Sequence, residues 1–155
     1  MSSPEGSTVL FRLVPPGVRP LALHRFARRL EREVCGGRSF TCLIAGDGEL
    51  RRLNRDFRGK DYSTDVLSFP GQGGTGAFDF QSFLGDIAIS RHRAAAQARE
   101  FGHPPETEIR ILMLHGVLHL LGMDHESDGG RMARAEKRWR ARLHLPNGLI
   151  ERVRA

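Results

Sequence analysis

The chain has 155 residues, a length that suits one domain with a substantial hydrophobic core. Its hydrophobic content of 39% and charged content of 27% are ordinary for a globular protein, and its net charge is +6. No stretch approaches the ~20 apolar residues of a membrane span, and residues 1–17 lack the basic segment and apolar run of a secretory signal, so we expect a cytoplasmic protein.

Four segments have the composition of strands, and five have the apolar spacing of helices. The expected strands are 7–14, 39–46, 64–69 and 83–90. The expected helices are 20–34, a helix following Asp47, 91–101, 107–122 and 128–143. Pro20 suits the first turn of the first helix, and Asp47 is a candidate N-cap for the second. Because strands and helices interleave, the sequence predicts one layered domain over residues 1–155, of the α/β or α+β class.

Cys35 and Cys42 lie on either side of a Gly-Gly turn and match no metal-ligand spacing, so we expect two buried free thiols. The segment 71–76, GQGGTG, is expected to be a flexible loop. It lacks the Lys-Ser/Thr ending and the strand-to-helix setting of a phosphate-binding loop. The helix 107–122 is apolar on nearly every side, which predicts that it is buried in the centre of the domain.

Three histidines lie within HGVLHLLGMDH, residues 115–125. His115 and His119 are four residues apart, so a helix projects them from one face, one turn apart. Gly122 can end that helix in the left-handed conformation and bring His125 back toward the other two. Three imidazoles with an open fourth position are typical of catalytic zinc, so we expect one Zn²⁺ per chain, with nickel, cobalt or iron as alternatives. The other interpretation is three core histidines, each with its own buried hydrogen bonds.

The spacing of the three histidines equals that of the metzincin motif H-E-x-x-H-x-x-G-x-x-H. The second position of the motif is Gly116 here, whereas in the proteases it is the Glu that acts as general base. The sequence therefore predicts a protease-like metal geometry without the protease base.

Three segments resemble the YbeY endoribonucleases, also called rRNA maturation factors. They are LNRDFRGKDYSTDVLSFP (53–70), LGDIAIS (84–90) and HGVLHLLGMDH (115–125). The resemblance implies an α/β domain with a small mixed four-stranded sheet packed by about five helices. It implies a zinc held by His115, His119 and His125, on a buried central helix and the turn after it. It further implies single-strand-specific cleavage of rRNA, in maturation of the small-subunit rRNA 3′ end and in ribosome quality control, so the partners are rRNA and the small ribosomal subunit.

Arg58 occupies the arginine of the family's L-N-x-x-[YF]-R-x-K-D pattern, so the resemblance indicates that it is catalytic. Charge that develops on a phosphate needs a fixed cation, and a planar guanidinium binds two oxygens. A metal can lower the pKa of water and polarise a phosphoryl oxygen, so RNA cleavage is compatible with the missing Glu. The residues alone leave open an ion pair of Arg58 with Asp56 or Asp61, and attack by either water or the 2′-OH.

Two aspartates are further candidates for the site. Asp124 precedes His125 and either orients an imidazole ligand or caps the turn. Asp86 is polar within the strand 83–90, and it either faces the metal site or pairs with Arg91.

The excess of basic over acidic residues lies in residues 131–155, which hold eight Arg or Lys and two Glu and so carry the whole net charge of +6. One stripe of the predicted helix consists of Arg131, Arg134, Arg138 and Arg142, and a second stripe of Met132, Trp139 and Leu143. We expect the second stripe to pack on the domain and the first to contact RNA phosphates, although a solvated helix face explains the arginines equally well.

Two other functions are compatible with the sequence. One is a metallopeptidase whose base comes from outside the histidine motif. The other is a non-catalytic ribosome-assembly factor that binds RNA and holds a structural metal.

Overall fold

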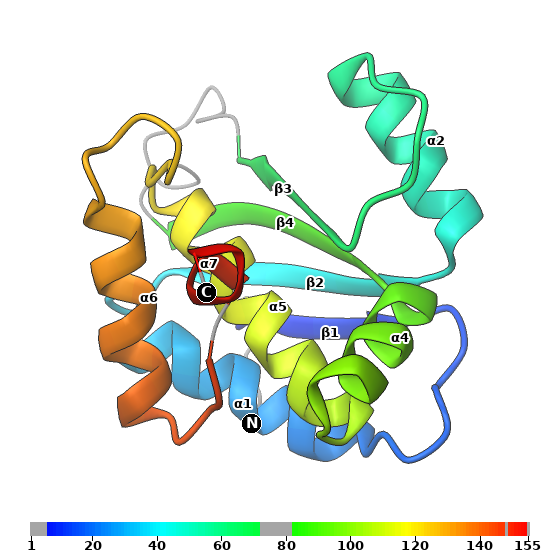
Figure 1. The fold of residues 1–155 in the computed structure, drawn as a ribbon, viewed down its shortest axis with the longest axis horizontal. Coiled ribbons are helices and arrows are strands. Elements are labelled where there is room, and N and C mark those ends of the chain that lie inside the picture. Colours follow the sequence, from blue (N-terminus) through cyan, green and yellow to red (C-terminus); the bar gives the residue numbers. More distant parts are fainter. Residues whose placement is uncertain (1–5, 72–81, 148, 155) are drawn as a thin grey trace.

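A computed structural model of the chain describes residues 6–71, 82–147 and 149–154 (Figure 1). The strands are β1 (Thr8–Phe11), β2 (Ser39–Ala45), β3 (Val66–Pro70) and β4 (Phe83–Ser90). The helices are α1 (Pro20–Glu33), α2 (Asp47–Arg58), α4 (Arg91–Phe101), α5 (Pro105–Leu120), α6 (Arg131–Arg142) and α7 (Leu149–Arg154). None of the helices in these ranges is long and apolar enough to cross a bilayer.

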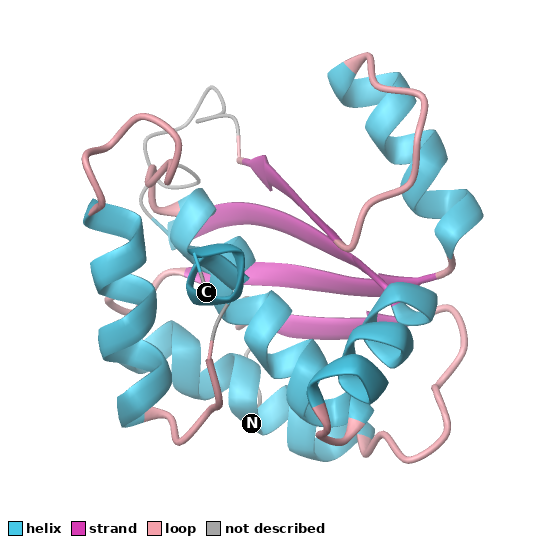
Figure 2. Cartoon of the chain, in the orientation of Figure 1, coloured by secondary structure: helices cyan, strands magenta, loops and turns pink. Residues whose placement is uncertain are grey.

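The four strands form one sheet in the order β1-β2-β4-β3 (Figure 2). The strands β1, β2 and β4 are parallel, whereas β3 runs antiparallel to β4 and lies at the edge. The sheet is therefore mixed, and the α/β class with a small four-stranded mixed sheet is confirmed.

The helices α1 and α5 cover the inner face of this sheet. Side chains of a strand alternate between the two faces, and Phe40, Cys42 and Ile44 of β2 join α1 and α5 in the main core. The helix α5 is buried on nearly every side, as its apolar sequence predicts. Both cysteines are buried and free, also as predicted. Burial raises the pKa of the Cys35 thiol to about 12, so this thiol stays protonated at neutral pH.

The outer face of the sheet is covered at one end by α2, which stands apart from the other helices in Figure 1. Leu50 of α2 packs there with Ala45, Leu67 and Ala88 in a small second core. Farther along the same face, Leu10 of β1 is 53% exposed. Part of the outer face is therefore open among the described residues.

The predicted N-cap of α2 is wrong. Gly46 occupies the N-cap position, and Asp47 is the first helical residue. The Asp47 carboxylate accepts hydrogen bonds from the hydroxyls of Ser63 and Ser90 instead of capping the helix. These two hydroxyls come from the segments before β3 and at the end of β4, so the carboxylate joins α2 to the sheet.

Two other local predictions also differ from the structure. The helix α5 begins at Pro105, earlier than the predicted 107, because proline suits the first helical position. The helix α7 was not predicted, since a segment as short as 149–154 carries little periodic signal. Apart from Gly71, the predicted loop 71–76 lies outside the described residues.

Glu106 in the first turn of α5 ties the starts of two helices together. Its carboxylate accepts hydrogen bonds from the backbone and side chain of Arg19, the residue before α1, and pairs with Arg110. The hydrogen bond from Arg19 is the main cause that lowers the pKa of Glu106 from 4.5 to about 2.

We expect Glu106→Gln to lower the free energy of unfolding by about 1.5–3 kcal/mol at pH 7, the range for hydrogen bonds to charged groups. A carboxyl with a depressed folded pKa stabilises fully above its unfolded value and loses that contribution as pH falls through the folded value. The difference between wild type and variant should therefore shrink between pH 4.5 and about 2. Urea unfolding at several pH values measures this difference in the free energy of unfolding. Glu33→Gln, in an exposed pair with Arg29, is the control, and an equal, pH-independent loss in both variants contradicts the prediction.

Candidate metal centre and its pocket

The three histidines of the motif meet at the end of α5. His115 and His119 project from one face of the helix, and Gly122, with φ +90°, follows the helix end and reverses the chain. His125 then returns to the same place. The ring centroids are 4.8 Å apart for His115 and His119, and each lies 6.0 Å from that of His125.

These imidazoles fit a single metal ion. One nitrogen from each ring lies within 4.8 Å of the other two, and small side-chain rotations bring such nitrogens within Zn–N bonds of about 2.0–2.1 Å. His119 is partly buried, and this burial, followed by the nearby His115, lowers its pKa despite an opposing backbone hydrogen bond with Met123. A lowered pKa favours the neutral imidazole, which is the form that binds metals.

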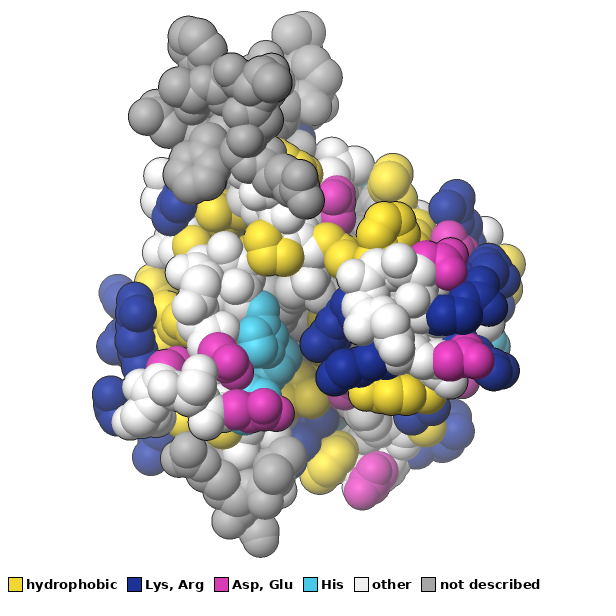
Figure 3. All heavy atoms as spheres, turned by 90° about the horizontal axis from the view of Figure 1, so that it is seen from above, with side chains coloured by type: hydrophobic (Ala, Val, Ile, Leu, Met, Phe, Trp, Pro, Cys, Tyr) yellow, Lys and Arg dark blue, Asp and Glu magenta, His cyan; other side chains and the backbone are white. Residues whose placement is uncertain are grey.

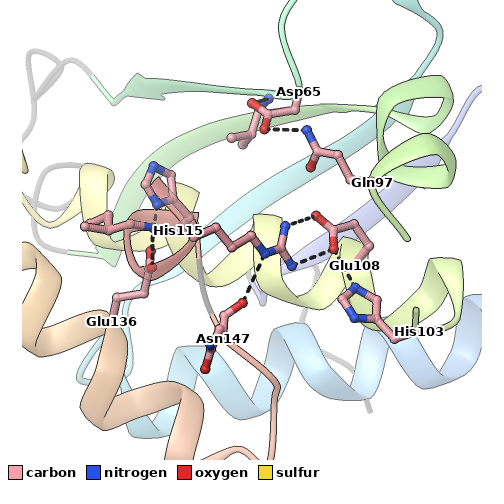
Figure 4. A network of polar contacts seen from close by, with 10 residues as sticks. Asp65, Gln97, His103, Glu108, His115, Glu136 and Asn147 are labelled. Atoms are coloured by element: carbon pink, nitrogen blue, oxygen red, sulfur yellow. Dashed lines mark hydrogen bonds and ion pairs between the residues drawn. The ribbon is translucent and has the colours of Figure 1, made fainter. Parts of the chain in front are cut away.

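A buried carboxylate, that of Glu136 on α6, holds the first histidine. His115 Nδ1 lies 2.8 Å from Glu136 Oε2 (Figure 4), which leaves His115 Nε2 for a metal. The other carboxylate oxygen, Oε1, accepts a hydrogen bond of 2.8 Å from the backbone N–H of Ile150 on α7. A carboxylate that is hydrogen-bonded to the other ring nitrogen of a histidine ligand fixes the tautomer and the ring orientation of that histidine.

Sequence reasoning did not single out Glu136, although a signal was present. Met132, Trp139 and Leu143 were assigned to the packing stripe of the last helix, and position 136 falls on the same stripe. An acid among packing residues needs a buried partner, since buried charges are rarely left unpaired. In the structure Glu136 is only 1% exposed and its partner is His115.

The helix α7 is anchored beside this centre by a second buried acid, Glu108 of α5. Arg152 of α7 donates two hydrogen bonds of 2.7 and 2.8 Å to the Glu108 carboxylate. His103 Nε2 lies 2.6 Å from the same carboxylate (Figure 4). The Arg152 guanidinium also lies 4.1 Å from the Phe101 ring centroid. These contacts hold the α7 backbone where Ile150 meets Glu136.

Gly116 lies where α5 packs against the sheet. A Cβ at this position would lie 3.0 Å from the side chain of Ile87 on β4, and the Gly116 carbonyl accepts a hydrogen bond from the Ser68 hydroxyl of β3. The position that bears the base in metzincins therefore faces the packed sheet in this chain. A glutamate has no room there, which gives a steric reason for its absence.

The histidines line a cavity of about 430 Å³ that also contains Arg58, Glu126 and residues of β3. Figure 3 shows the histidines at a hollow, with basic side chains across it. The alternative ion pairs of Arg58 are not formed, because Asp56 pairs with Arg55 and Asp61 pairs with Arg51. Within the described part of the chain, no hydrogen bond or ion pair holds the exposed Arg58 side chain.

The two candidate aspartates do not reach the histidine cavity as ligand-orienting groups. Asp124 caps its own turn, because its carboxylate accepts hydrogen bonds from the Glu126 backbone and the Ser127 hydroxyl. Asp86 points to the outer face of the sheet, where it accepts a hydrogen bond from Thr41. Its neighbour Ile87 faces α5, and strand alternation sends Asp86 the other way. The interpretation that Asp86 faces the metal site is therefore wrong, and so is its pairing with Arg91.

The last long helix, α6, presents the two stripes as expected. Met132 and Leu143 are buried, and Trp139 packs against the main core. The four arginines of the other stripe are exposed, and they are Arg131, Arg134, Arg138 and Arg142. None of these four lines the histidine cavity, so contact with RNA by this stripe stays a prediction.

An open pocket with three clustered imidazoles and an exposed arginine on an α/β domain is typical of a metal-dependent hydrolase. The family model for Endoribonuclease YbeY matches residues 22–144. The chain is 67% identical to Endoribonuclease YbeY of Solibacter usitatus over the full length of both. It is 46% identical to that of Koribacter versatilis, with 88% of this chain and 86% of the relative covered.

The fold also occurs in a solved structure. A solution structure of a Thermotoga maritima protein superposes with a TM-score of 0.57 at 28% identity, and it covers 86% of this chain and 85% of that one. The chain belongs to the YbeY endoribonuclease family.

Proposed function

We propose that this chain is a zinc-dependent endoribonuclease that cuts single-stranded RNA. Its substrate is rRNA in the cytoplasm, including the 3′ end of small-subunit rRNA, and the cleavage serves rRNA maturation and ribosome quality control. Membership of the YbeY endoribonuclease family supports this activity. The observation that carries the proposal is the cluster of three imidazoles with the exposed Arg58 in the same cavity, where no described residue pairs with it.

Each residue of the cavity has a separate role in the proposed reaction. His115, His119 and His125 hold the zinc, and Glu136 keeps the His115 proton on Nδ1 so that Nε2 is free. When bound, the zinc supplies Lewis-acid activation of water and of a phosphoryl oxygen. Arg58 binds oxygens of the scissile phosphate and stabilises the negative charge that develops there.

The arginine stripe of α6 binds the phosphates of the same RNA outside the cavity. Its four guanidiniums are exposed and evenly spaced along one side of the helix. Contacts of this kind hold the RNA without reading its sequence, and each makes the affinity fall as salt rises.

A peptidase is the less suitable function for this site. The position of the protease base is Gly116, which packs against Ile87. A non-catalytic assembly factor has the same metal and arginine stripe but no cleavage, so activity distinguishes it.

The test measures zinc and cleavage on one preparation. Wild type, His119→Ala and the control His24→Ala, a histidine on α1 outside the cavity, are assayed for zinc by elemental analysis. Each is then incubated with single-stranded RNA, duplex RNA and casein. We expect about one zinc per chain in wild type and control, cleavage of single-stranded RNA only, and loss of both zinc and cleavage in His119→Ala.

Each contrary result has a definite meaning. Cleavage that persists undiminished in His119→Ala indicates a contaminating nuclease and contradicts the site. Zinc in wild type without RNA cleavage contradicts the nuclease and favours the assembly factor. Casein cleavage favours the peptidase.

A further inference from the structure

A second cavity lies on the outer face of the sheet, outside the metal centre. Its volume is about 360 Å³. Its apolar floor comes from β1, β2 and β4, and α2 with β3 forms a wall. The described residues show no side chain of this chain that fills it.

The floor of this cavity joins an apolar row to a polar one. Sheet register places Leu43 of β2 beside Leu10 and Ala88, and this row is apolar. In the next row on the same face, Thr41 lies beside Asp86. The Thr41 hydroxyl donates to Asp86 Oδ1, and no hydrogen bond to Asp86 Oδ2 occurs among the described residues.

An exposed aromatic ring borders the cavity. Phe57, near the end of α2, is 70% exposed, which is unusual for a large apolar side chain. Its ring meets Phe69 of β3 edge-on, with centroids 5.7 Å apart and an interplanar angle of 67°. An edge contact of this kind leaves a face of the Phe57 ring free to stack on a planar ligand.

The outer cavity and the metal cavity share two walls. Phe57 lines the outer cavity, and the next residue, Arg58, lines the metal cavity. Phe69 and Ser68 are likewise consecutive on the edge strand β3, and they line the outer and the metal cavity respectively. A chain whose phosphate is bound at Arg58 therefore has the outer cavity within reach across the β3 edge.

We propose that the outer cavity is a nucleobase subsite of the single-stranded RNA that the metal centre cleaves, with Phe57 stacking on the base and Asp86 accepting a hydrogen bond from its amino group. The inference rests on the proposed function. A single-stranded RNA has unstacked bases, and aromatic side chains bind them whatever their sequence.

The charge of the cavity favours a base over a phosphate. The floor carries the Asp86 carboxylate, which repels phosphate, and the nearby Arg12 is already paired with Glu49 at 3.0 Å. A carboxylate accepts from the exocyclic amine of cytosine, whereas uracil presents a carbonyl oxygen at the same position. Cytosine is therefore preferred over uracil.

The first test measures stacking in a background without cleavage. Binding of a fluorescent single-stranded cytidine-rich RNA is compared between His119→Ala alone and His119→Ala combined with Phe57→Ala, Phe57→Trp or Leu21→Ala. We expect Phe57→Ala to weaken binding about 5- to 150-fold, as for loss of one stacked base. Phe57→Trp should retain binding. The control Leu21→Ala removes another exposed apolar side chain, on α1, and should have no effect.

The second test uses free nucleosides, which carry no phosphate and need no metal. Amide resonances of wild type are followed by NMR during titration with cytidine or uridine. We expect cytidine to shift Leu43, Ala88 and Phe69, with an affinity for cytidine about fivefold or more above that for uridine. Asp86→Asn should reduce this preference, because an amide also donates to the uracil oxygen.

The outcomes of these tests distinguish the nucleobase subsite from the proposed nuclease activity. Unchanged RNA affinity in Phe57→Ala, or no cytidine shift at these amides, overturns the subsite while cleavage by wild type upholds the nuclease. If wild type fails to cleave RNA but cytidine shifts the same amides and Phe57→Ala abolishes the shift, the subsite stands and the nuclease is wrong.

Discussion

Replacing Arg58 with Ala is expected to lower kcat/KM for single-stranded RNA by about 10²–10³-fold, the effect of removing one donor to a developing anion. The side chain lines the cavity of the three histidines and is exposed, so it can reach a phosphate held there. Because no ion pair or hydrogen bond among the described residues uses Arg58, its loss should leave the unfolding midpoint and the zinc content unchanged.

A neighbouring arginine provides the matched control. Arg55 lies on the same helix, is paired with Asp56 and does not line the cavity. Arg55→Ala removes the same charge, so it should weaken cleavage only modestly and through salt-dependent binding. Arg58→Lys keeps the charge without the planar fork and should restore part of the activity. Equal losses in Arg55→Ala and Arg58→Ala would show that net charge alone matters.

Glu136→Gln is expected to lower the affinity for zinc by about 10–100-fold, the usual cost of losing the partner behind a metal ligand. In the structure one carboxylate oxygen accepts from Ile150 N–H and the other lies 2.8 Å from His115 Nδ1. A glutamine has one acceptor oxygen for these two donors. If its amide group faces His115, the imidazole proton moves to Nε2, the nitrogen that a metal needs.

Competition with a fluorescent chelator measures this affinity, and urea unfolding of the metal-free protein measures stability separately. The control is Glu33→Gln, an exposed acid of α1. A purely structural role for Glu136 predicts a loss of metal-free stability with unchanged zinc affinity in the folded protein. That result would contradict the assigned role, whereas a loss of affinity in excess of the control supports it.

The same contacts connect the end of the chain with the metal centre. Arg152 is held by Glu108, and this pair fixes α7, whose Ile150 N–H in turn fixes Glu136. Removal of residues 149–155 should therefore weaken zinc binding through His115.

The sequence by itself determined the features that depend on local geometry. The fourfold spacing of His115 and His119 on a helix, and a glycine that reverses the chain before His125, bring three rings together over a short stretch. The four strands and the buried α5 were equally readable, because strand composition and helix hydrophobicity are properties of continuous segments. The resemblance to YbeY endoribonucleases rested on motifs of the same local kind.

The tertiary structure alone decided what depends on residues far apart in the chain. Glu136 and His115 are 21 residues apart in the sequence. The packing of α6 on α5 brings them together, and no local sequence periodicity predicts this contact. The sequence left open whether Asp86 faces the metal site, because alternation along a strand says which residues share a face but not which face the helices cover. The two ion pairs considered for Arg58 likewise depended on its neighbours, since Asp56 and Asp61 pair with other arginines. Backbone periodicity is encoded within a few residues, whereas the partner of a side chain is set by how whole elements pack.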